Sequence, residues 1–232
     1  MPRFFVGTDQ ISDKNIVITG TDVNHIRNVL RMAPGEEVTV SDGQGMDYFC
    51  KIAELTKEEV RLDIIDSWHS FVELPAKIYL FQGLPKADKM ELIIQKAVEL
   101  GVYEIVPVAT KRAVVKLDAK KEEKKRLRWQ SIAESAAKQA GRALIPQVAP
   151  CMNFDKALRM CNGLDAALIP YEKAEGMQHA RDQVRALHGK HSIGIFIGPE
   201  GGFEESEIEA ARAAGAIPIT LGHRILRTET AG

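Results

Sequence analysis

Residues Ile195–Phe203 read IFIGPEGGF, an apolar run that enters a turn with three glycines and then an acidic helical pattern. This order predicts a β-strand, a tight turn and the start of a helix. The stretches Ala167–Glu172 (ALIPYE) and Thr220–Gly232 (TLGHRILRTETAG) also include the ends of apolar runs. Because ligands of parallel sheets bind at the carboxyl ends of the strands, we expect these three loops to line one pocket. A glycine in such a turn can also serve backbone geometry alone.

The chemistry of the Gly198–Gly202 turn limits the ligand that it can hold. It has neither the GxGxxG nor the GxxxxGK[ST] spacing of phosphate-binding loops. The carboxylates of Glu200, Glu204 and Glu205 would also repel a phosphate at the start of the helix. A ligand with an adenosine end, no phosphate and a positive centre is better tolerated. S-adenosylmethionine meets this description, although these residues alone do not single it out.

The chain divides into two patterns. Residues 1–70 contain short β-branched or alternating runs and one helical stretch, Thr21–Met32, with a cap signal at its start; they predict a small β-barrel. Residues 71–232 alternate strand-like and helix-like stretches, among them the predicted helices Lys86–Gly101 and Lys120–Gly141. Such alternation predicts a mostly parallel sheet with helices on both faces. The predicted fold class is therefore α/β, with a barrel domain at 1–70 and an α/β domain at 71–232.

The composition is that of a globular protein, and its charge is uneven. No apolar run approaches the roughly 18 residues needed to span a bilayer. The three scattered cysteines lack metal-site spacing and indicate reduced thiols, hence a cytoplasmic protein without a metal site. Residues 77–142 hold 15 Lys and Arg against 8 Asp and Glu, whereas residues 1–70 hold 7 against 12. The basic region suits a polyanion such as RNA, although a solvated helix face explains Lys120–Arg128 equally well.

Two motifs near the carboxyl end resemble a known signature. The stretches IGPEGGFEESE (Ile197–Glu207) and LGHRILRTETAG (Leu221–Gly232) are similar to those of the SPOUT superfamily of methyltransferases and, within it, the RsmE family of ribosomal RNA small-subunit methyltransferases. The likeness extends to Lys86–Val108 and His25–Met32, and so covers nearly the whole chain. It implies a PUA-like barrel followed by a trefoil-knotted α/β domain, S-adenosylmethionine as cofactor, and a homodimer. It also implies methylation of N3 of one uridine in 16S RNA, with the assembled small ribosomal subunit as substrate.

The resemblance includes one departure. Members of the family continue past the RTETAG motif into a final helix, whereas this sequence stops at Gly232. In the family that helix packs against the knot and helps to build the dimer. The resemblance therefore does not extend to the depth of the knot, the cofactor affinity or the dimer stability.

The resemblance also implies the residues of the site. The cofactor pocket corresponds to Leu168, Ile169 and Pro170, to Gly198, Pro199, Glu200 and Gly201, and to Leu221, Gly222, Ile225, Leu226 and Arg227. Such a set suits adenine, because backbone groups and aliphatic side chains can hold the ring and glycines allow close approach. For Glu200 two roles are equally compatible with the sequence: an acidic residue in the first turn of the helix, or a contact with the cofactor. Arg227 and Glu229 are the catalytic candidates, for stabilising a uracil anion and accepting the N3 proton, but the motif does not assign these tasks.

Ten residues are candidates for RNA binding. They are Arg3, His25 and Arg31 in the small domain, and Lys86, Lys89, Lys96, Arg112, Arg128, Lys138 and Arg142 in the basic centre. If the basic centre holds phosphates, changing Arg112 or Arg142 to alanine should flatten the salt dependence of subunit binding by roughly one log–log unit each. Because both arginines lie far in sequence from the glycine loops, we expect their loss to leave cofactor affinity unchanged.

Two other functions are compatible with the same residues. One is a non-catalytic RNA-binding or ribosome-assembly protein that has kept the fold. The other is a methyltransferase of the same superfamily that acts on tRNA, another RNA or a small molecule. Cofactor binding separates the first from an enzyme, and activity on assembled small subunits compared with free RNA separates the second.

Overall fold

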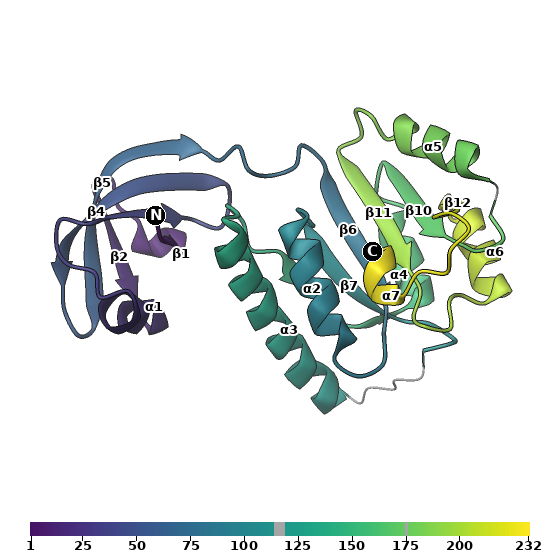
Figure 1. Ribbon diagram of the computed structural model, residues 1–232, viewed down its shortest axis with the longest axis horizontal. Helices are drawn as coiled ribbons and strands as arrows, with labels where there is room; N and C mark the ends of the chain where they lie inside the picture. Colours follow the sequence, from purple (N-terminus) through teal and green to yellow (C-terminus); the bar gives the residue numbers. More distant parts are fainter. Residues whose placement is uncertain (114–118, 175) are drawn as a thin grey trace. The chain divides into compact units, whose positions relative to one another are not determined.

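The chain forms two compact units (Figure 1). The computed structural model describes residues 1–113, 119–174 and 176–232. The first unit consists of residues 1–73 and 137–145, and the second of residues 74–136 and 146–232. The predicted boundary at residue 70 places residues 137–145 in the second domain, whereas in the structure they belong to the first unit. Helical periodicity predicts a helix, but it carries no information about which domain the end of that helix contacts.

The first unit is a curled five-stranded sheet around an apolar core. Its strands are β1 (Arg3–Phe5), β2 (Asn15–Thr19), β3 (Glu37–Ser41), β4 (Met46–Leu55) and β5 (Glu59–His69). They lie in the order β1-β3-β4-β5-β2, antiparallel except for the parallel pair β1 and β3. Side chains alternate as the sequence predicts: Ile16 and Ile18 of β2 are buried, and the residues at its two ends are exposed.

The segment after β2 differs from the predicted helix Thr21–Met32. It contains one short α-helix, α1 (Thr21–Asn24), followed by a π-helical turn, η2 (His25–Val29). The predicted side-chain cap does not form. The Asp22 carboxylate instead accepts hydrogen bonds from Lys138 Nζ at 3.0 Å. A tertiary ion pair has thus replaced the local capping interaction, and a sequence pattern does not contain that partner.

A polar cluster holds residues 137–145 in the first unit. Arg142 is 5% exposed, and its guanidinium is bound to the carboxylate of Glu73. Arg3 Nη1 donates to Asp47 Oδ1 at 2.6 Å and to the carbonyl oxygen of Arg142 at 3.4 Å. Both guanidinium groups are therefore engaged inside the unit, and a phosphate could reach either one only by displacing these partners.

Replacing Arg142 with alanine should destabilise the protein and leave the salt dependence of RNA binding unchanged. The substitution leaves the Glu73 carboxylate without its buried partner, a change that typically costs about 3–5 kcal/mol. Urea unfolding measures the loss, with Arg61→Ala as the control, because the Arg61 side chain is 58% exposed and its pair with Glu59 contributes little. Equal stability of the two variants would contradict the buried role of Arg142.

The second unit is built on a parallel sheet, which confirms the predicted α/β class. Its strands are β6 (Lys77–Gly83), β7 (Glu104–Ala109), β8 (Gln147–Val148), β9 (Met152–Asn153), β10 (Ala166–Pro170), β11 (Ser192–Ile197) and β12 (Ile217–Ile219). The order is β12-β10-β11-β6-β7-β8, with β9 pairing separately with β7, and the paired strands are parallel.

Helices cover both faces of this sheet, as predicted (Figure 1). They are α2 (Lys89–Glu99), α3 (Ala119–Ala140), α4 (Phe154–Cys161), α5 (Met177–Ala186), α6 (Glu205–Ala213) and α7 (Thr228–Ala231). On one face α4 and α6 enclose the stacked rings of Phe81 and Phe196. On the other face α2 packs against α7, and α5 covers Leu168 and Ile219. Because neighbouring side chains of a strand alternate, Gln82 points to the face of α2 and α7.

The chain leaves β6 and β11 in opposite directions, although these strands are neighbours. After β6 it forms α2 and then β7 on one side, and after β11 it forms α6 and then β12 on the other. At such a switch point the carboxyl ends of two adjacent strands leave a crevice, which is the usual ligand position in open α/β sheets. The loops that meet there begin at Leu84 and Gly198.

Two further properties concern the membrane and the thiols. Among the described residues, no helix is both long enough and apolar enough to cross a bilayer. The three cysteines carry free thiols, and burial raises the pKa of Cys50 to about 12 and that of Cys161 to about 11. These buried thiols are therefore protonated at neutral pH and unreactive.

Candidate active site

The glycine turn after β11 lies directly against the end of β6. A Cβ atom placed on Gly83 would lie 2.6 Å from Pro199 Cδ and 2.8 Å from Pro199 N, closer than nonbonded atoms allow. A Cβ on Gly198 would lie 3.0 Å from Gly202 Cα. The contact between strand and turn therefore requires glycine at position 83. Sequence analysis did not predict this role of Gly83. The feature that could have indicated it is the position of this glycine at the end of an apolar strand.

A buried hydrogen-bonded network joins the glycine turn to α7. Thr228 Oγ1 donates to the carbonyl oxygen of Gly198 at 2.6 Å and accepts from Gln82 Nε2 at 3.0 Å. The Gln82 amide also donates to the carbonyl oxygen of Gly83 at 2.9 Å. Gln82 is fully buried and Thr228 is 6% exposed, so these bonds are shielded from water. The network fixes β6, the turn and α7 as one structure, and neither Gln82 nor Thr228 was among the predicted site residues.

A charged cluster ties α2, the glycine turn and α7 together nearer the surface. Lys89 Nζ, from the first residue of α2, lies 2.9 Å from Glu200 Oε1 and 3.5 Å from Glu229 Oε2. Arg227 Nη1 lies 4.0 Å from Glu229 Oε1. The side chain of Glu229 is 15% exposed, whereas that of Arg227 is 81% exposed. The structure thus brings the two predicted catalytic residues together, with the carboxylate sheltered and the guanidinium in solvent.

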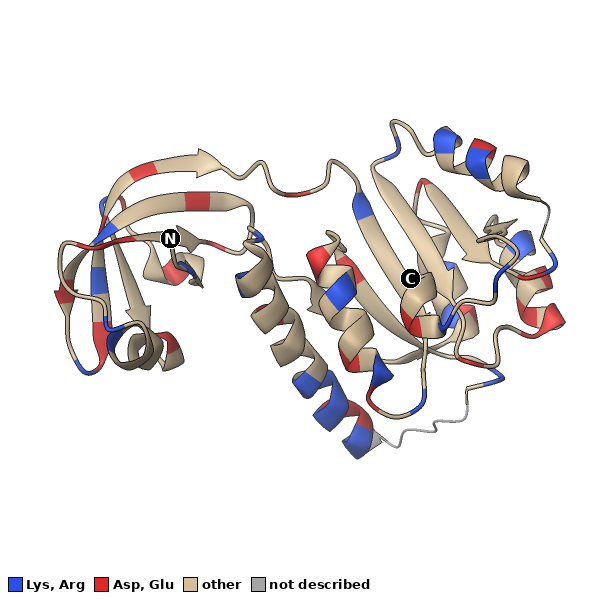
Figure 2. Ribbon diagram, in the orientation of Figure 1, with Lys and Arg blue, Asp and Glu red and all other residues tan. Residues whose placement is uncertain are grey.

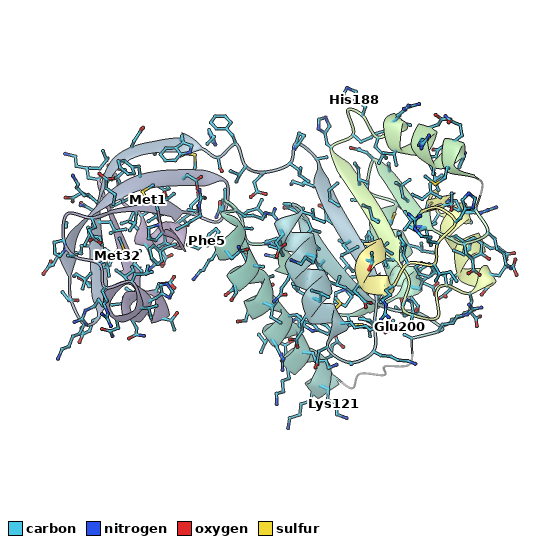
Figure 3. All side chains as sticks on the ribbon, in the orientation of Figure 1. Met1, Phe5, Met32, Lys121, His188 and Glu200 are labelled. Atoms are coloured by element: carbon cyan, nitrogen blue, oxygen red, sulfur yellow. The ribbon has the colours of Figure 1, made fainter. Side chains whose placement is uncertain are left out.

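Glu200, which is labelled in Figure 3, fastens the glycine turn to the start of α2 by its pair with Lys89. It is not a first-turn helix acid, because α6 begins at Glu205. Its carboxylate accepts from the backbone N–H of Lys86 at 3.1 Å as well as pairing with Lys89. Partial burial raises the pKa of Glu200, but the hydrogen bonds from Lys89 and from the Lys86 N–H outweigh this effect and hold the pKa below its ordinary value. The carboxylate is therefore ionised at neutral pH.

Carboxylates of the protein itself occupy the start of α6. The N–H of Glu204 donates to Glu207 Oε2 at 2.9 Å, and the N–H of Lys111 donates to Glu207 Oε1 at 2.9 Å. Glu207 is only 3% exposed, and Glu204 completes a capping box. A phosphate at this helix start would meet these negative charges, and the Glu204 N–H is already used. The geometry agrees with the sequence argument against a phosphate ligand.

Arg112 lies against the glycine turn, although it is far from the turn in the sequence. Its Nη1 donates to the carbonyl oxygen of Gly201 at 3.0 Å. A Cβ on Gly201 would lie 3.2 Å from Arg112 Cβ. The physical reason is that β7, which ends at Ala109, is next to β6 in the sheet, so the residues after β7 reach the turn. Gly201 makes room for this arginine as well as for any ligand.

Replacing Arg112 with alanine should therefore weaken cofactor binding, since the turn loses an anchor. One hydrogen bond contributes about 0.5–1.5 kcal/mol, which corresponds to roughly 2- to 10-fold in affinity. Isothermal titration with S-adenosylmethionine measures the change. Arg126→Ala is the matched control, because within the described residues Arg126 pairs along its own helix with Glu123. An unchanged dissociation constant for the Arg112 variant would mean that the turn holds its shape without this bond.

The predicted cofactor residues differ in exposure. Leu168 and Ile169 are 4% and 0% exposed and pack into the helix-covered faces of the sheet, so their side chains are not available to a ligand at its edge. Pro170 ends β10 beside them. Three other aliphatic side chains are uncovered: Leu221, Ile225 and Leu226, at 42%, 97% and 37%. They precede Thr228, which bonds to the turn, and they offer an apolar surface that suits a flat ring.

Several predicted RNA-binding cations are paired with carboxylates. These pairs are Lys96–Glu99, Arg128–Glu91 and Lys138–Asp22. By contrast, His25, Arg31 and Lys86 are exposed, and their side chains form no ion pair within the described ranges. Lys and Arg also gather on the first half of α3 (Figure 2), the stretch for which binding of a polyanion and a solvated face are both compatible with the sequence. The excess of Lys and Arg in residues 77–142 therefore does not amount to a continuous set of unpaired positive charges.

Two open depressions lie away from the carboxyl ends of the strands. One, of about 420 Å³, includes Cys161, Ala166 and Gly215, and one of about 340 Å³ includes His179 and Arg212. Both are at the amino ends of β10 and β12, opposite the glycine turn. In the part of the chain that the structure describes, no three His, Cys, Asp or Glu side chains are grouped so as to hold a metal ion. The candidate site is therefore the group formed at the carboxyl ends of β6 and β11 by Lys89, the Gly198–Gly201 turn and Arg227–Glu229, called the strand-end cluster below.

Known proteins resemble this chain over its whole length. The RNA methyltransferase domain family matches residues 72–232, and the RNA methyltransferase PUA domain family matches residues 18–65. Ribosomal RNA small subunit methyltransferase E of Bacillus subtilis (strain 168) is 38% identical over 237 residues, which cover 100% of this chain and 93% of the relative. The chain belongs to the ribosomal RNA small subunit methyltransferase E family. Its PUA-like amino-terminal domain and its methyltransferase domain confirm the predicted resemblance.

Two further members of the ribosomal RNA small subunit methyltransferase E family extend the comparison. The Neisseria gonorrhoeae protein, whose crystal structure has S-adenosyl methionine bound, is 35% identical with a TM-score of 0.87 and covers 100% of this chain and 93% of its own. The Mesomycoplasma hyopneumoniae (strain 232) relative is 33% identical over 231 residues, covering 100% of this chain and 95% of its own. The similarity therefore includes both units and every segment of the strand-end cluster.

Proposed function

We propose that this chain transfers a methyl group from S-adenosylmethionine to N3 of a specific uridine in 16S ribosomal RNA, with the assembled small subunit as substrate. Its family supports methyl transfer to ribosomal RNA. One observation carries the assignment of the site. The glycine turn and the Arg227–Glu229 segment are joined through Thr228 and Lys89 at the switch point of the parallel sheet.

The residues at this edge fit the proposed cofactor. Leu221, Ile225 and Leu226 leave aliphatic surface uncovered for an adenine ring. The segment that contains Leu226 is joined to the glycine turn by the bond from Thr228 to Gly198. The carboxylates at the start of α6 disfavour a phosphate, but they do not disfavour a positive centre. When bound, S-adenosylmethionine supplies a methyl group carried on a positively charged sulfur.

Glu229 and Arg227 have the properties that the transfer to uracil needs. N3 of uracil keeps its proton at pH 7, so this proton must leave as the new bond to the methyl group forms. We assign this proton to the Glu229 carboxylate, which is 15% exposed and therefore shielded from bulk water. The Arg227 guanidinium, 4.0 Å from it and mostly in solvent, is free to approach O2 or O4 and stabilise the developing negative charge.

RNA binding is assigned to charges that the fold leaves exposed. His25 and Arg31 in the first unit and Lys86 in the second have side chains without an ion pair in the described ranges. Such groups position RNA by its phosphates and do not read its sequence. N3 lies on the pairing edge of the base, so the target uridine must be unpaired and unstacked before it reacts.

The trefoil knot and the homodimer implied by the family complete the proposal. Twofold dimers are the commonest assembly of soluble proteins. Sedimentation velocity at micromolar concentration should show a dimer, and a single monomeric species would count against this part of the proposal.

Cofactor titration and methyl transfer test the proposal together. S-adenosylmethionine should bind at one site per subunit, and purified small ribosomal subunits should gain 3-methyluridine. No binding at millimolar ligand would instead support a non-catalytic RNA-binding or ribosome-assembly protein. Binding with transfer only to tRNA or another RNA would keep the enzyme and replace its substrate.

A further inference from the structure

Lys89 lies where the glycine turn, α7 and α2 meet. Its ammonium nitrogen is 2.9 Å from Glu200 Oε1 and 3.5 Å from Glu229 Oε2, and its side chain is 31% exposed. Because α2 packs against α7, this first residue of α2 spans both neighbouring segments. Charge alone predicts Lys89 as an RNA contact, whereas the structure places it between two carboxylates.

An ammonium in this position is a poor ligand for an RNA phosphate. Its positive charge is already shared by Glu200 and Glu229, and the hydrogen bond to Glu200 raises the pKa of Lys89. A phosphate that approached the nitrogen would come close to both carboxylates and be repelled by them. The neighbouring Lys86 differs, because only its backbone N–H is used by Glu200 and its side chain is exposed.

We propose that Lys89 is a positioning residue for methyl transfer, which holds Glu229 and the glycine turn in register through one shared ammonium group. The proposal rests on the function proposed above and adds a residue to it. Glu200 is the contact through which Lys89 fixes the turn, and Glu229 is the contact through which it fixes the proton acceptor.

The expected consequence of losing the ammonium follows from the two carboxylates. Both lie within 3.5 Å of the same nitrogen, so without it they would face each other uncompensated and repel. Glu229 would move relative to Arg227, or Glu200 would release the turn from the start of α2. A displacement of about 1 Å in a reacting arrangement can lower the rate on the order of 10²-fold.

Single-turnover methyl transfer with Lys89→Met, at saturating cofactor and saturating small subunits, tests the proposal. The rate should fall on the order of 10²-fold, whereas the dissociation constant for the subunit and its salt dependence stay as in the parent. Lys89→Arg should recover part of the rate, because it keeps a charge between the carboxylates. Lys156→Met is the matched control: this exposed lysine of α4 forms no ion pair in the described ranges, and its loss should change the rate by less than about 2-fold.

The proposal is overturned if Lys89→Met changes subunit binding and leaves the rate of methyl transfer unchanged. If Lys89→Met weakens subunit binding, flattens the salt dependence by about one log–log unit and keeps the saturated rate, then Lys89 is a phosphate contact. If Lys89→Met and Lys156→Met behave alike, it has no role in the reaction. If the parent protein itself neither binds S-adenosylmethionine nor methylates the subunit, the proposed function fails, and this outcome is distinct from the other two.

A double-mutant cycle with Glu229→Gln shows whether Lys89 acts through Glu229. In the Glu229→Gln background, Lys89→Met should lower the remaining rate by less than about 3-fold, because the contact that it supports is already lost. A full loss on the order of 10²-fold in that background would exclude Glu229 as the group that Lys89 positions.

Discussion

Replacing Gly83 with alanine should weaken S-adenosylmethionine binding by about 10- to 100-fold, in a protein that still folds. The added Cβ would lie 2.6 Å from Pro199 Cδ, 2.8 Å from Pro199 N and 3.1 Å from the carbonyl carbon of Gly198. Two of these are backbone atoms, so the clash cannot be relieved by turning a side chain. Overpacking of this kind costs about 1–3 kcal/mol, and a loop that moves to avoid it loses affinity by roughly the factor stated.

Isothermal titration of the Gly83 variant measures this effect, and thermal unfolding shows that the fold is kept. Gly163→Ala is the matched control, because a Cβ at that position lies 3.6 Å from the carbonyl oxygen of Met160, an ordinary contact. The control should bind the cofactor like the parent. Parental affinity in the Gly83 variant would show that the contact between β6 and the turn is not part of the binding site.

Replacing Glu229 with glutamine should lower the single-turnover rate by about 10²- to 10⁴-fold, the usual contribution of a positioned proton acceptor. Glutamine has nearly the same shape, so cofactor affinity should change little. The carboxylate is suited to this role because its side chain is 15% exposed and lies beside Arg227. The control is Glu205→Gln, since the Glu205 side chain is 73% exposed and, in the part of the chain that the structure describes, pairs with Lys173 at 3.8 Å.

The rate measurements need the cofactor titration beside them. A Glu229 variant with the parental rate would exclude this carboxylate as the proton acceptor and leave Arg227 as the catalytic candidate of the segment. A variant that has lost cofactor affinity to the same extent as the rate would place Glu229 in cofactor binding instead of proton transfer.

Local patterns predicted the layers of the fold but not its shortest elements. The alternation of strands and helices beyond residue 71 predicted the parallel sheet with helices on both faces, because apolar periodicity is a local property of each element. The strands β8 and β9 have two residues each, and α7 has four. Segments of this length contain only about one period of a strand or helix pattern, too little to show periodicity, so their tertiary partners define them.

The candidate site was predicted only in part, because a sequence pattern does not show which distant residues a side chain contacts. The glycines of the Gly198–Gly201 turn stand out by their spacing, whereas Gln82 and Gly83 matter because of contacts with residues more than a hundred positions away. The charge of Lys89 is visible in the sequence, but its two carboxylate partners are not. The same holds for Arg142, which reads as a surface cation and is buried beside Glu73.

The central claim is that the strand-end cluster methylates N3 of a uridine in small-subunit RNA. Incubation of the purified protein and small ribosomal subunits with S-adenosylmethionine carrying a deuterated methyl group, followed by mass spectrometry of the nucleosides of the RNA, tests it most directly. We expect deuterated 3-methyluridine from a single site, formed by the parent and the Gly163→Ala control and strongly reduced in Glu229→Gln. A deuterated methyl group on another nucleoside, or no label in the RNA while the cofactor binds, would contradict it.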